Sequence, residues 1–287
     1  PVVQNSGGTG YVYSLAFDTA NILYVGGYFN TVKATARNYA AALEVTGSGV
    51  LQAWNPNANN QVNAIAASGS TIFLGGNFTT LNGGTARNRL ASVNNSNGTL
   101  LAFNPNMNSN VNALAISGNI LNVGGAFTTV NGGVSTRNYL AAYNVSSGAL
   151  NAWAPNANNA VNAIAAVTDT VYTGGYFTTL NTTTRNRLGA IRGAAGTALM
   201  AFDPNANNLI RNNFIANHTL LVGGPFTTLG GLSRGGFAVY LLPGSGPAPA
   251  VASQPEISNI QQGMPQQTAF ALYPNPSNGL VTLRLNN

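Results

Sequence analysis

The fold is decided by the stretch Thr71-Ile72-Phe73-Leu74-Gly75-Gly76-Asn77-Phe78-Thr79-Thr80-Leu81, a β-rich run that enters two glycines and continues into a Phe-Thr-Thr tail. The glycine pair recurs at Gly26-Gly27, Gly124-Gly125, Gly174-Gly175 and Gly223-Gly224, so successive copies lie 49, 49, 50 and 49 residues apart. A near-constant period of this size is typical of a chain built from structural repeats.

Each repeat has the pattern of four short strands. In the second copy, residues 62–66 and 71–74 are β-rich runs around a Ser-Gly turn, which predicts a hairpin. Residues 87–93 follow an Asn-Gly-Gly turn and predict a third strand, and residues 100–103 predict a fourth. Four antiparallel strands per unit of 40 to 50 residues is the pattern of a propeller blade. The sequence therefore predicts an all-β fold, a five-bladed β-propeller of four-stranded antiparallel blades.

The fifth repeat lacks a fourth strand, because its third predicted strand runs directly into Pro243-Gly244. The N-terminal Pro1-Val2-Val3-Gln4 aligns with the fourth strand of the other units. We therefore expect the N-terminal strand to close the last blade and remove an open sheet edge. A β-solenoid is the alternative, although it would need an unusually long coil and capping ends.

Three segments follow from the composition along the chain. Residues 1–242 form the propeller, residues 243–256 have the Pro/Gly/Ala-rich composition of a semi-extended linker, and residues 257–287 end in a short β segment.

The composition argues against several classes of partner. Only 6% of residues are charged, against about 25% in an average domain. The net charge of +6 comes from 11 basic residues scattered along the chain, and a nucleic-acid site would need them clustered. The sequence contains no run of about 18 apolar residues, so it predicts no transmembrane segment. There is no Cys for disulfides or thiolate metal sites.

Two resemblances bear on location. The recurring Val-Asn-Ala-Ile-Ala, Gly-Gly-x-Phe-Thr, Arg-Asn-x-Leu-Ala and Ala-Trp-x-Pro-Asn phrases resemble the delta-sixty repeat family of secreted bacterial propeller-like proteins. That resemblance implies an extracellular propeller and carries no shared enzymatic activity. The tail Leu272-Tyr273-Pro274-Asn275-Pro276 with Val281-Thr282-Leu283 resembles the start of the C-terminal sorting domain of the Bacteroidetes type IX secretion system. It implies export and an extracellular or cell-surface location.

The chain offers few groups for catalysis. Its acids are Asp18, Glu44, Asp169, Asp203 and Glu256, and its one histidine is His218. No two carboxylates recur or pair in the sequence as a glycosidase would need. We predict no enzymatic activity, no cofactor and no metal site, and a propeller-scaffold glycoside hydrolase or lyase is the least favoured alternative.

One arginine recurs at the predicted start of each third strand, and by repetition these residues form a ring: Arg37, Arg87, Arg137, Arg185 and Arg234. The functional interpretation is an anion-binding crown at a channel mouth. The favoured interpretation is structural, with each guanidinium tying neighbouring loops and carbonyls together.

A second recurring position holds Trp54, Phe103, Trp153 and Phe202, each followed two residues later by Pro and then by Asn-rich loops. Trp54 and Trp153 are candidates for stacking on sugar rings, and the loop amides could bind glycans. Packing between blades for the aromatic residues, and Asx turns for the loops, are the favoured interpretations.

Two triplets, Asp18-Thr19-Ala20 and Asp169-Thr170-Val171, resemble the Bacteroidetes O-glycosylation motif. That resemblance makes Thr19 and Thr170 candidate glycosylation sites, and we expect both in exposed hairpin turns.

These observations favour a secreted cell-surface protein with a structural or adhesive role. We expect a homo-oligomer or polymer, in which the tail strand containing Leu280, Val281, Thr282 and Leu283 adds to a neighbouring subunit. The alternative is a carbohydrate-binding surface module with surface glycans as its partners.

Overall fold

The computed structural model describes residues 3–5, 8–45, 49–193 and 201–242. The described elements are strands, apart from one short 3-10 helix, η1 (Asn131–Gly133), so the prediction of an all-β repeat fold is confirmed. The predicted linker at 243–256 and β segment at 257–287 lie outside the described residues. Within the described ranges, no helix is long and apolar enough to cross a membrane.

Each repeat forms one three-stranded antiparallel sheet, with its second strand in the centre. We call the three strands inner, middle and outer, and we number the repeats 1 to 5 along the chain. In that order the sheets are β3 (Tyr11–Phe17), β4 (Ile22–Tyr28) and β7 (Ala40–Glu44); β8 (Val62–Ser68), β9 (Thr71–Gly76) and β12 (Leu90–Asn94); β13 (Val111–Ser117), β14 (Ile120–Gly125) and β17 (Leu140–Asn144); β18 (Val161–Val167), β19 (Thr170–Gly175) and β22 (Leu188–Arg192); and β23 (Asn212–Ala216), β24 (Thr219–Gly223) and β27 (Phe237–Leu241).

Between the middle and outer strands, each repeat carries a small two-stranded hairpin. The hairpins are β5 (Thr31–Val32) with β6 (Thr35–Ala36), β10 (Thr80–Leu81) with β11 (Thr85–Ala86), β15 (Thr129–Val130) with β16 (Ser135–Thr136), β20 (Thr179–Leu180) with β21 (Thr183–Thr184), and β25 (Thr228–Leu229) with β26 (Leu232–Ser233). The Phe-Thr-Thr tail of the repeat phrase leads into this hairpin.

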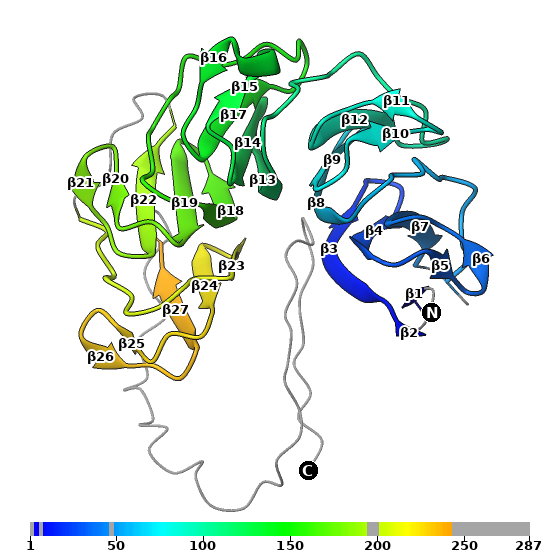
Figure 1. Cartoon of the computed structure of the whole chain (residues 1–287). Coiled ribbons are helices and arrows are strands. Elements are labelled where there is room, and N and C mark those ends of the chain that lie inside the picture. The colour runs from blue at the N-terminus through cyan, green and yellow to red at the C-terminus, as the bar shows by residue number, and fades with distance from the viewer. Residues whose placement is uncertain (1–2, 6–7, 46–48, 194–200, 243–287) are drawn as a thin grey trace, which may run out of the picture.

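The five sheets follow one another around an open arc (Figure 1). Inner strands of successive repeats pack side by side, β3 with β8, β8 with β13, β13 with β18 and β18 with β23. Four of the five hydrophobic clusters are shared between two successive repeats, so each core belongs to an interface between sheets. The arc is open, and β3 of repeat 1 and β23 of repeat 5 lie at its two ends (Figure 1).

In repeats 1 to 3 the predicted fourth strand is reduced to a single bridge. Leu51, Leu100 and Leu150 each make one isolated antiparallel bridge to the outer strand of their own repeat. The prediction of four-stranded blades was wrong in this respect. The chain leaves the sheet after one bridge because a Pro follows within a few residues and cannot donate to a ladder.

The predicted closure of the last blade by the N-terminus was also wrong for the residues described. Strand β1 (Val3–Asn5) pairs with β2 (Gly8–Thr9) and with β5, both next to repeat 1. Val3 packs against the apolar cluster of repeat 1, which includes Phe29 and Val32. Local burial therefore holds this strand at the first sheet, and it does not reach the last.

The glycine pair allows two close approaches. The second glycine faces a β-bulge in the inner strand, where a Cβ on Gly76 would collide with the carbonyl oxygen of Gln61. The first glycine receives the next repeat, because a Cβ on Gly75 would lie 2.5 Å from Val111 Cγ1. The same clash recurs when Gly26 or Gly124 is given a Cβ. Glycine is thus required where one sheet packs on the next.

We expect Gly75→Ala to lower the free energy of unfolding by about 1–3 kcal/mol, because the added methyl overpacks the interface with repeat 3. Gly223→Ala is the matched control, since a Cβ there meets no atom closer than 4.0 Å. Its reduced unfolded-state entropy predicts no loss, or a gain of about 0.4–1 kcal/mol. Thermal unfolding in dilute solution compares the two, and equal losses would contradict the packing explanation.

Candidate functional site

The most elaborate polar structure in the described residues lies in the connectors, the segments that lead from one outer strand to the next inner strand. In the first connector, Asn59 Oδ1 accepts hydrogen bonds from the backbone N–H groups of Thr79 (2.8 Å) and Thr80 (3.0 Å) in repeat 2. Its Nδ2 donates to Thr79 Oγ1 at 2.8 Å. Equivalent contacts to the following hairpin are made by Asn108, Asn158 and Asn207.

A second set of asparagines ties each connector back to its own repeat. Four amide pairs recur, Asn38 with Asn57 (2.7 Å), Asn88 with Asn106 (2.6 Å), Asn138 with Asn156 (3.1 Å) and Asn186 with Asn205 (2.7 Å). Three of the acceptors, Asn57, Asn106 and Asn205, have positive φ, a conformation that asparagine tolerates better than most residues. The amides that were candidates for glycan binding are therefore used to clamp two repeats together.

The recurring arginines complete this clamp. Arg137 donates from Nη1 to Thr136 O and from Nη2 to Asn151 O, both at 2.8 Å. The Nη2 groups of Arg37 and Arg87 reach the equivalent connector carbonyls, at Gln52 O (2.7 Å) and Leu101 O (3.2 Å). Each guanidinium thus holds the hairpin and the connector of one repeat.

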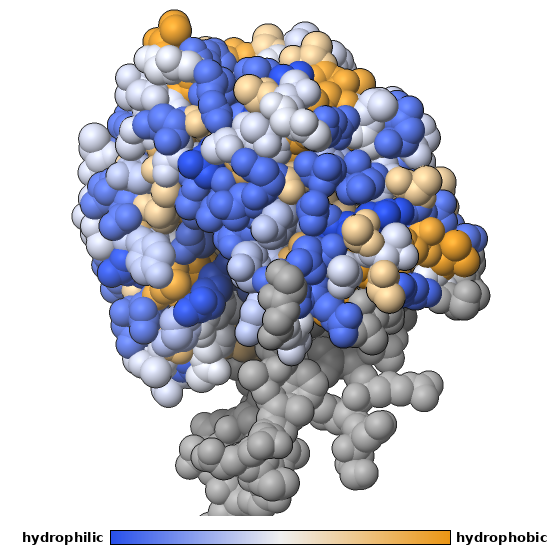
Figure 2. All heavy atoms as spheres, turned by 45° about the vertical axis from the view of Figure 1, so that its right-hand side comes forward, coloured by the Kyte–Doolittle hydropathy of each residue, from blue (hydrophilic) through white to orange (hydrophobic). Residues whose placement is uncertain are grey.

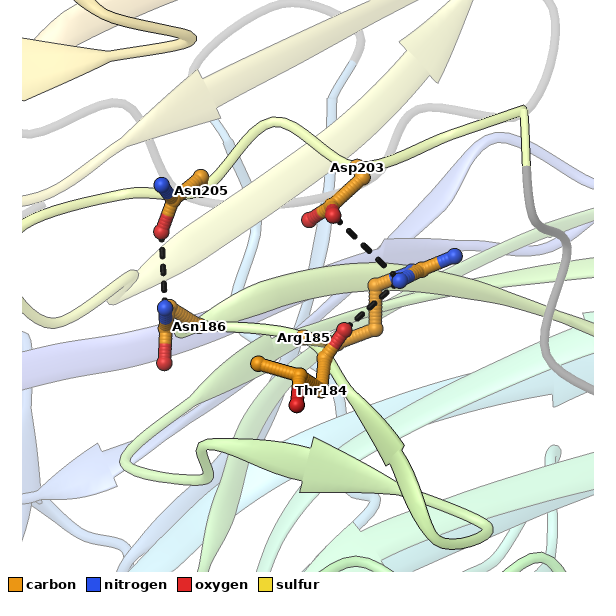
Figure 3. A network of polar contacts seen from close by, with 5 residues as sticks. All are labelled: Thr184, Arg185, Asn186, Asp203 and Asn205. Carbon is orange, nitrogen blue, oxygen red and sulfur yellow. Dashed lines mark hydrogen bonds and ion pairs between the residues drawn. The ribbon is translucent and has the colours of Figure 1, made fainter.

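Repeat 4 adds a charge to the same arrangement. Arg185 Nη1 donates to Thr184 O at 2.6 Å and forms an ion pair with Asp203 Oδ2 at 3.3 Å. Figure 3 shows Arg185 between the carbonyl of Thr184 and the carboxylate of Asp203, with the amide pair of Asn186 and Asn205 beside them. Arg185 is buried, so the carboxylate partly compensates a cation removed from water.

These contacts agree with the structural interpretation of the arginine ring and leave little of it for an anion. The Nε atoms of Arg37, Arg87 and Arg137 are buried and make no hydrogen bond. The arginines also lie between the hairpin and the outer strand, not at the start of a strand as predicted. Arg234 differs from the others because no following connector is described, and its hydrogen bond is to Ser233 O at 3.3 Å.

We expect Arg137→Lys to lower the free energy of unfolding by about 1–3 kcal/mol, because one ammonium cannot reproduce the planar fork between two carbonyls. Arg234→Lys is the control and should change stability by less than about 0.5 kcal/mol. Chemical denaturation measures both. An equal loss of stability at Arg137 and Arg234 would show that the hydrogen bond to the connector carbonyl does not stabilise the fold.

The two tryptophans are buried, which contradicts the candidate role of Trp54 and Trp153 in contacting glycans. Trp54 is 1% exposed and Trp153 is 4% exposed. Their indole Nε1 groups donate to Asn94 O and Arg192 O, each at 2.9 Å, in the following repeat. Both side chains fill the space between sheets, as the alternative interpretation proposed.

The interfaces alternate between two ways of filling that space. Where the connector carries Trp, the following outer strand carries an aliphatic residue, Val93 or Ile191. Where it carries Phe103, the outer strand carries Tyr143, and the two rings pack edge to face with centroids 5.2 Å apart. Phe202 and Tyr240 repeat this pairing at 5.4 Å. The added ring on the outer strand partly replaces the volume of the missing indole.

A pocket of about 360 Å³ opens where Phe103 replaces tryptophan, between repeats 2 and 3. Its aromatic side is formed by Phe73, Phe103 and Tyr143, and its polar side includes Asn104 and Ser147. No charged residue lines it. Such a lining suits a neutral hydroxyl-rich ligand better than an ion.

Burial is the main cause of the shifted pKa values of the tyrosines at the interfaces. It raises the pKa of Tyr24, Tyr143, Tyr172 and Tyr240 above the ordinary value, and the neighbouring Asp18 raises that of Tyr24 further. The hydroxyl of Tyr24 donates to Asp18 Oδ2 at 2.9 Å. These groups hold neutral hydroxyls inside the protein and show no arrangement for proton transfer.

The raised tyrosine pKa values predict alkaline instability. Above about pH 10 the unfolded chain loses phenolic protons that the folded chain keeps, so the free energy of unfolding falls as pH rises. Below that pH these groups contribute no pH dependence. Tyr143→Phe should remove one contribution, up to about 1.4 kcal/mol per pH unit. Denaturation curves between pH 8 and 12 measure the slope, and an identical slope in Tyr143→Phe would contradict this explanation.

The other candidate residues are dispersed. Thr19 is exposed in the β3–β4 turn, as expected for a modification site. Thr170 is partly buried and is the first residue of β19, so its predicted place in a turn was wrong. In the described ranges, no three His, Cys, Asp or Glu residues gather to hold a metal. The surface in Figure 2 is largely hydrophilic with scattered apolar patches.

Sequence comparisons assign no family to this chain. No family pattern matches it, and no curated protein matches it. Among solved structures, the computationally designed Ika8 protein is similar with a TM-score of 0.48 and 14% identity, over 84% of this chain and 74% of that one. The designed Ika4 protein has a TM-score of 0.40 and 14% identity, over 84% and 98%. The Pan2 WD40 domain of Neurospora crassa has a TM-score of 0.49 and 10% identity, over 75% and 56%. These scores are low, and the fold described above rests on the strand pairing alone.

Proposed function

We propose that this protein is a structural or adhesive component of the cell surface, with no enzymatic activity. The observation that supports this proposal best is the use of its recurring polar residues. The arginines bind backbone carbonyls of the connectors, and the connector asparagines bind the hairpins and one another, so each repeat is held to the next by recurring hydrogen bonds. Such a framework suits a protein whose role is structural and whose fold must resist unfolding outside the cell.

Location and assembly belong to the same proposal. The tail that resembles a type IX sorting domain supports export to the cell surface. The predicted strand with Leu280, Val281, Thr282 and Leu283 lies outside the described residues, so its proposed addition to a neighbouring subunit depends on the sequence pattern alone.

The test is made in the producing organism. Antibodies against residues 8–242 should label intact cells, and deletion of the gene should reduce cell attachment or alter the cell envelope in electron micrographs. Restoring the gene with Arg137→Lys at a permissive temperature should restore both. Labelling only of broken cells, or normal attachment and envelope after deletion, would refute the proposed role.

A carbohydrate-binding module is the second candidate, and the pocket between repeats 2 and 3 favours it. Phe73 and Tyr143 are buried, so Phe103 is the aromatic residue of this lining that can contact a sugar ring, and the serine and asparagine groups can bond to hydroxyls. This candidate requires millimolar to micromolar affinity for a neutral saccharide.

Calorimetric titration with neutral oligosaccharides tests this candidate, using Asn104→Arg to obstruct the pocket. Ala154→Arg is the matched control, because Ala154 is exposed at the equivalent position of the next connector. Binding should fall at least about 10-fold in the first variant and remain unchanged in the second. Absence of binding by the wild type, or equal loss in both, would remove this candidate.

A further inference from the structure

The two ends of the arc expose opposite halves of one interface. Within the described residues that interface occurs four times, and each time the first glycine of one repeat receives side chains from the inner strand of the next or, for Ile210, from the residues just before it. Val62 and Ile65 pack on Gly26, Val161 and Ile164 pack on Gly124, and Ile210 packs on Gly174. Both partners are contributed by consecutive repeats.

Repeat 5 ends with the receiving half empty. We call Gly223, Phe237 and Val239 its trailing face. Among the described residues no side chain lies over Gly223, since the nearest atom to an added Cβ is Gly236 O at 4.0 Å. In the other repeats the residues that pair with the first glycine are fully buried, namely Ala40, Leu90, Leu140 and Leu188.

The exposure of the outer strand confirms that this face has lost a neighbour. Phe237 pairs with Gly223 and is 47% exposed. Val239 is 53% exposed, although its counterparts Ala42, Ser92, Ala142 and Ala190 are buried. Larger apolar residues therefore stand where the interface is uncovered, which is unfavourable for a face that stays in water.

Repeat 1 ends with the inserting half uncovered. We call Val12, Leu15 and Leu23 its leading face. Val12 and Leu15 hold the positions that Val62 and Ile65 have in repeat 2. Val12, Leu15 and Leu23 are only partly buried. The apolar cluster of repeat 1 is the one cluster in the described residues that contains no side chain from another repeat, and Val3 of β1 packs on it from the N-terminal segment.

We propose that the leading face of one copy packs on the trailing face of a second copy, with Val12 entering the space over Gly223. The geometry is that of the four internal interfaces, so the occupant is a second copy of this chain. The contact is head to tail, and repeated association gives a filament or a closed ring according to the rotation at each step.

This association gives the proposed structural role a mechanism, and it differs from strand addition by the tail. It is also separable from the cell-surface role, because it is measured on the purified full chain. Association of the purified chain without surface labelling of cells would refute the cell-surface role alone. Surface labelling without association would refute the head-to-tail contact alone.

The test uses two variants that each damage one face. Val12→Glu and Val239→Glu should each weaken self-association at least about 100-fold, because a carboxylate would be buried without a partner. Mixed in equal amounts, each variant still offers one intact face. We expect a one-to-one dimer that grows no further, detected by sedimentation velocity, while the wild type forms larger species.

Two further variants keep the result interpretable. Gly223→Val should abolish association without lowering the melting temperature, since its side chain enters open space in the monomer. Val134→Glu makes the same change as Val239→Glu at a position that is 85% exposed and far from both faces, and it should associate as the wild type does.

Several results would overturn the proposal. A wild type that stays monomeric at about 100 µM would do so. If Gly223→Val also lowered the melting temperature of that monomer, the space over Gly223 would be occupied within the same chain, which would mean that the two ends of the arc close on each other. Assembly that survives Gly223→Val and both glutamate variants would assign it to another surface or to the tail. Dimers in either glutamate variant alone would indicate a symmetric contact.

Discussion

The structure depends on one steric constraint, the packing of a branched side chain against a glycine that has no Cβ. This contact sets how closely one sheet approaches the next, and it recurs at Gly26, Gly75, Gly124 and Gly174. Because four of the five apolar clusters are shared by two repeats, most of the core lies between sheets and not within one sheet. Stability in such a chain is a sum over neighbouring interfaces, and the two ends must be managed separately.

Polar side chains serve the same interfaces. A connector must leave one sheet and enter the next, and its backbone groups would otherwise lack partners. Asparagine and threonine supply those partners without charge, and arginine supplies a fork that reaches two carbonyls at once. This explains how a chain with 6% charged residues can remain folded with a polar surface. It also leaves few side chains free for chemistry, which is consistent with the proposed structural role.

The differences among the repeats are as informative as their similarity. Trp54 and Trp153 alternate with Phe103 and Phe202, and Tyr143 compensates for the volume lost beside Phe103. The compensation is incomplete at the surface, and the pocket between repeats 2 and 3 is the result. In a periodic protein, a ligand site arises most readily where one repeat departs from the rest.

Sequence alone determined the period and the strand content, and it favoured the structural use of the arginines, because each is local or is repeated at a fixed spacing. It did not determine that the fourth strand shrinks to one bridge at Leu51, or that Val3 pairs beside repeat 1, since both depend on competition among distant partners. Burial of Trp54 also required the tertiary structure, because an aromatic at a regular position can face a neighbour or the solvent. Only the curvature of the arc decides which faces remain uncovered, and curvature is the accumulated result of small rotations between sheets that no single repeat encodes.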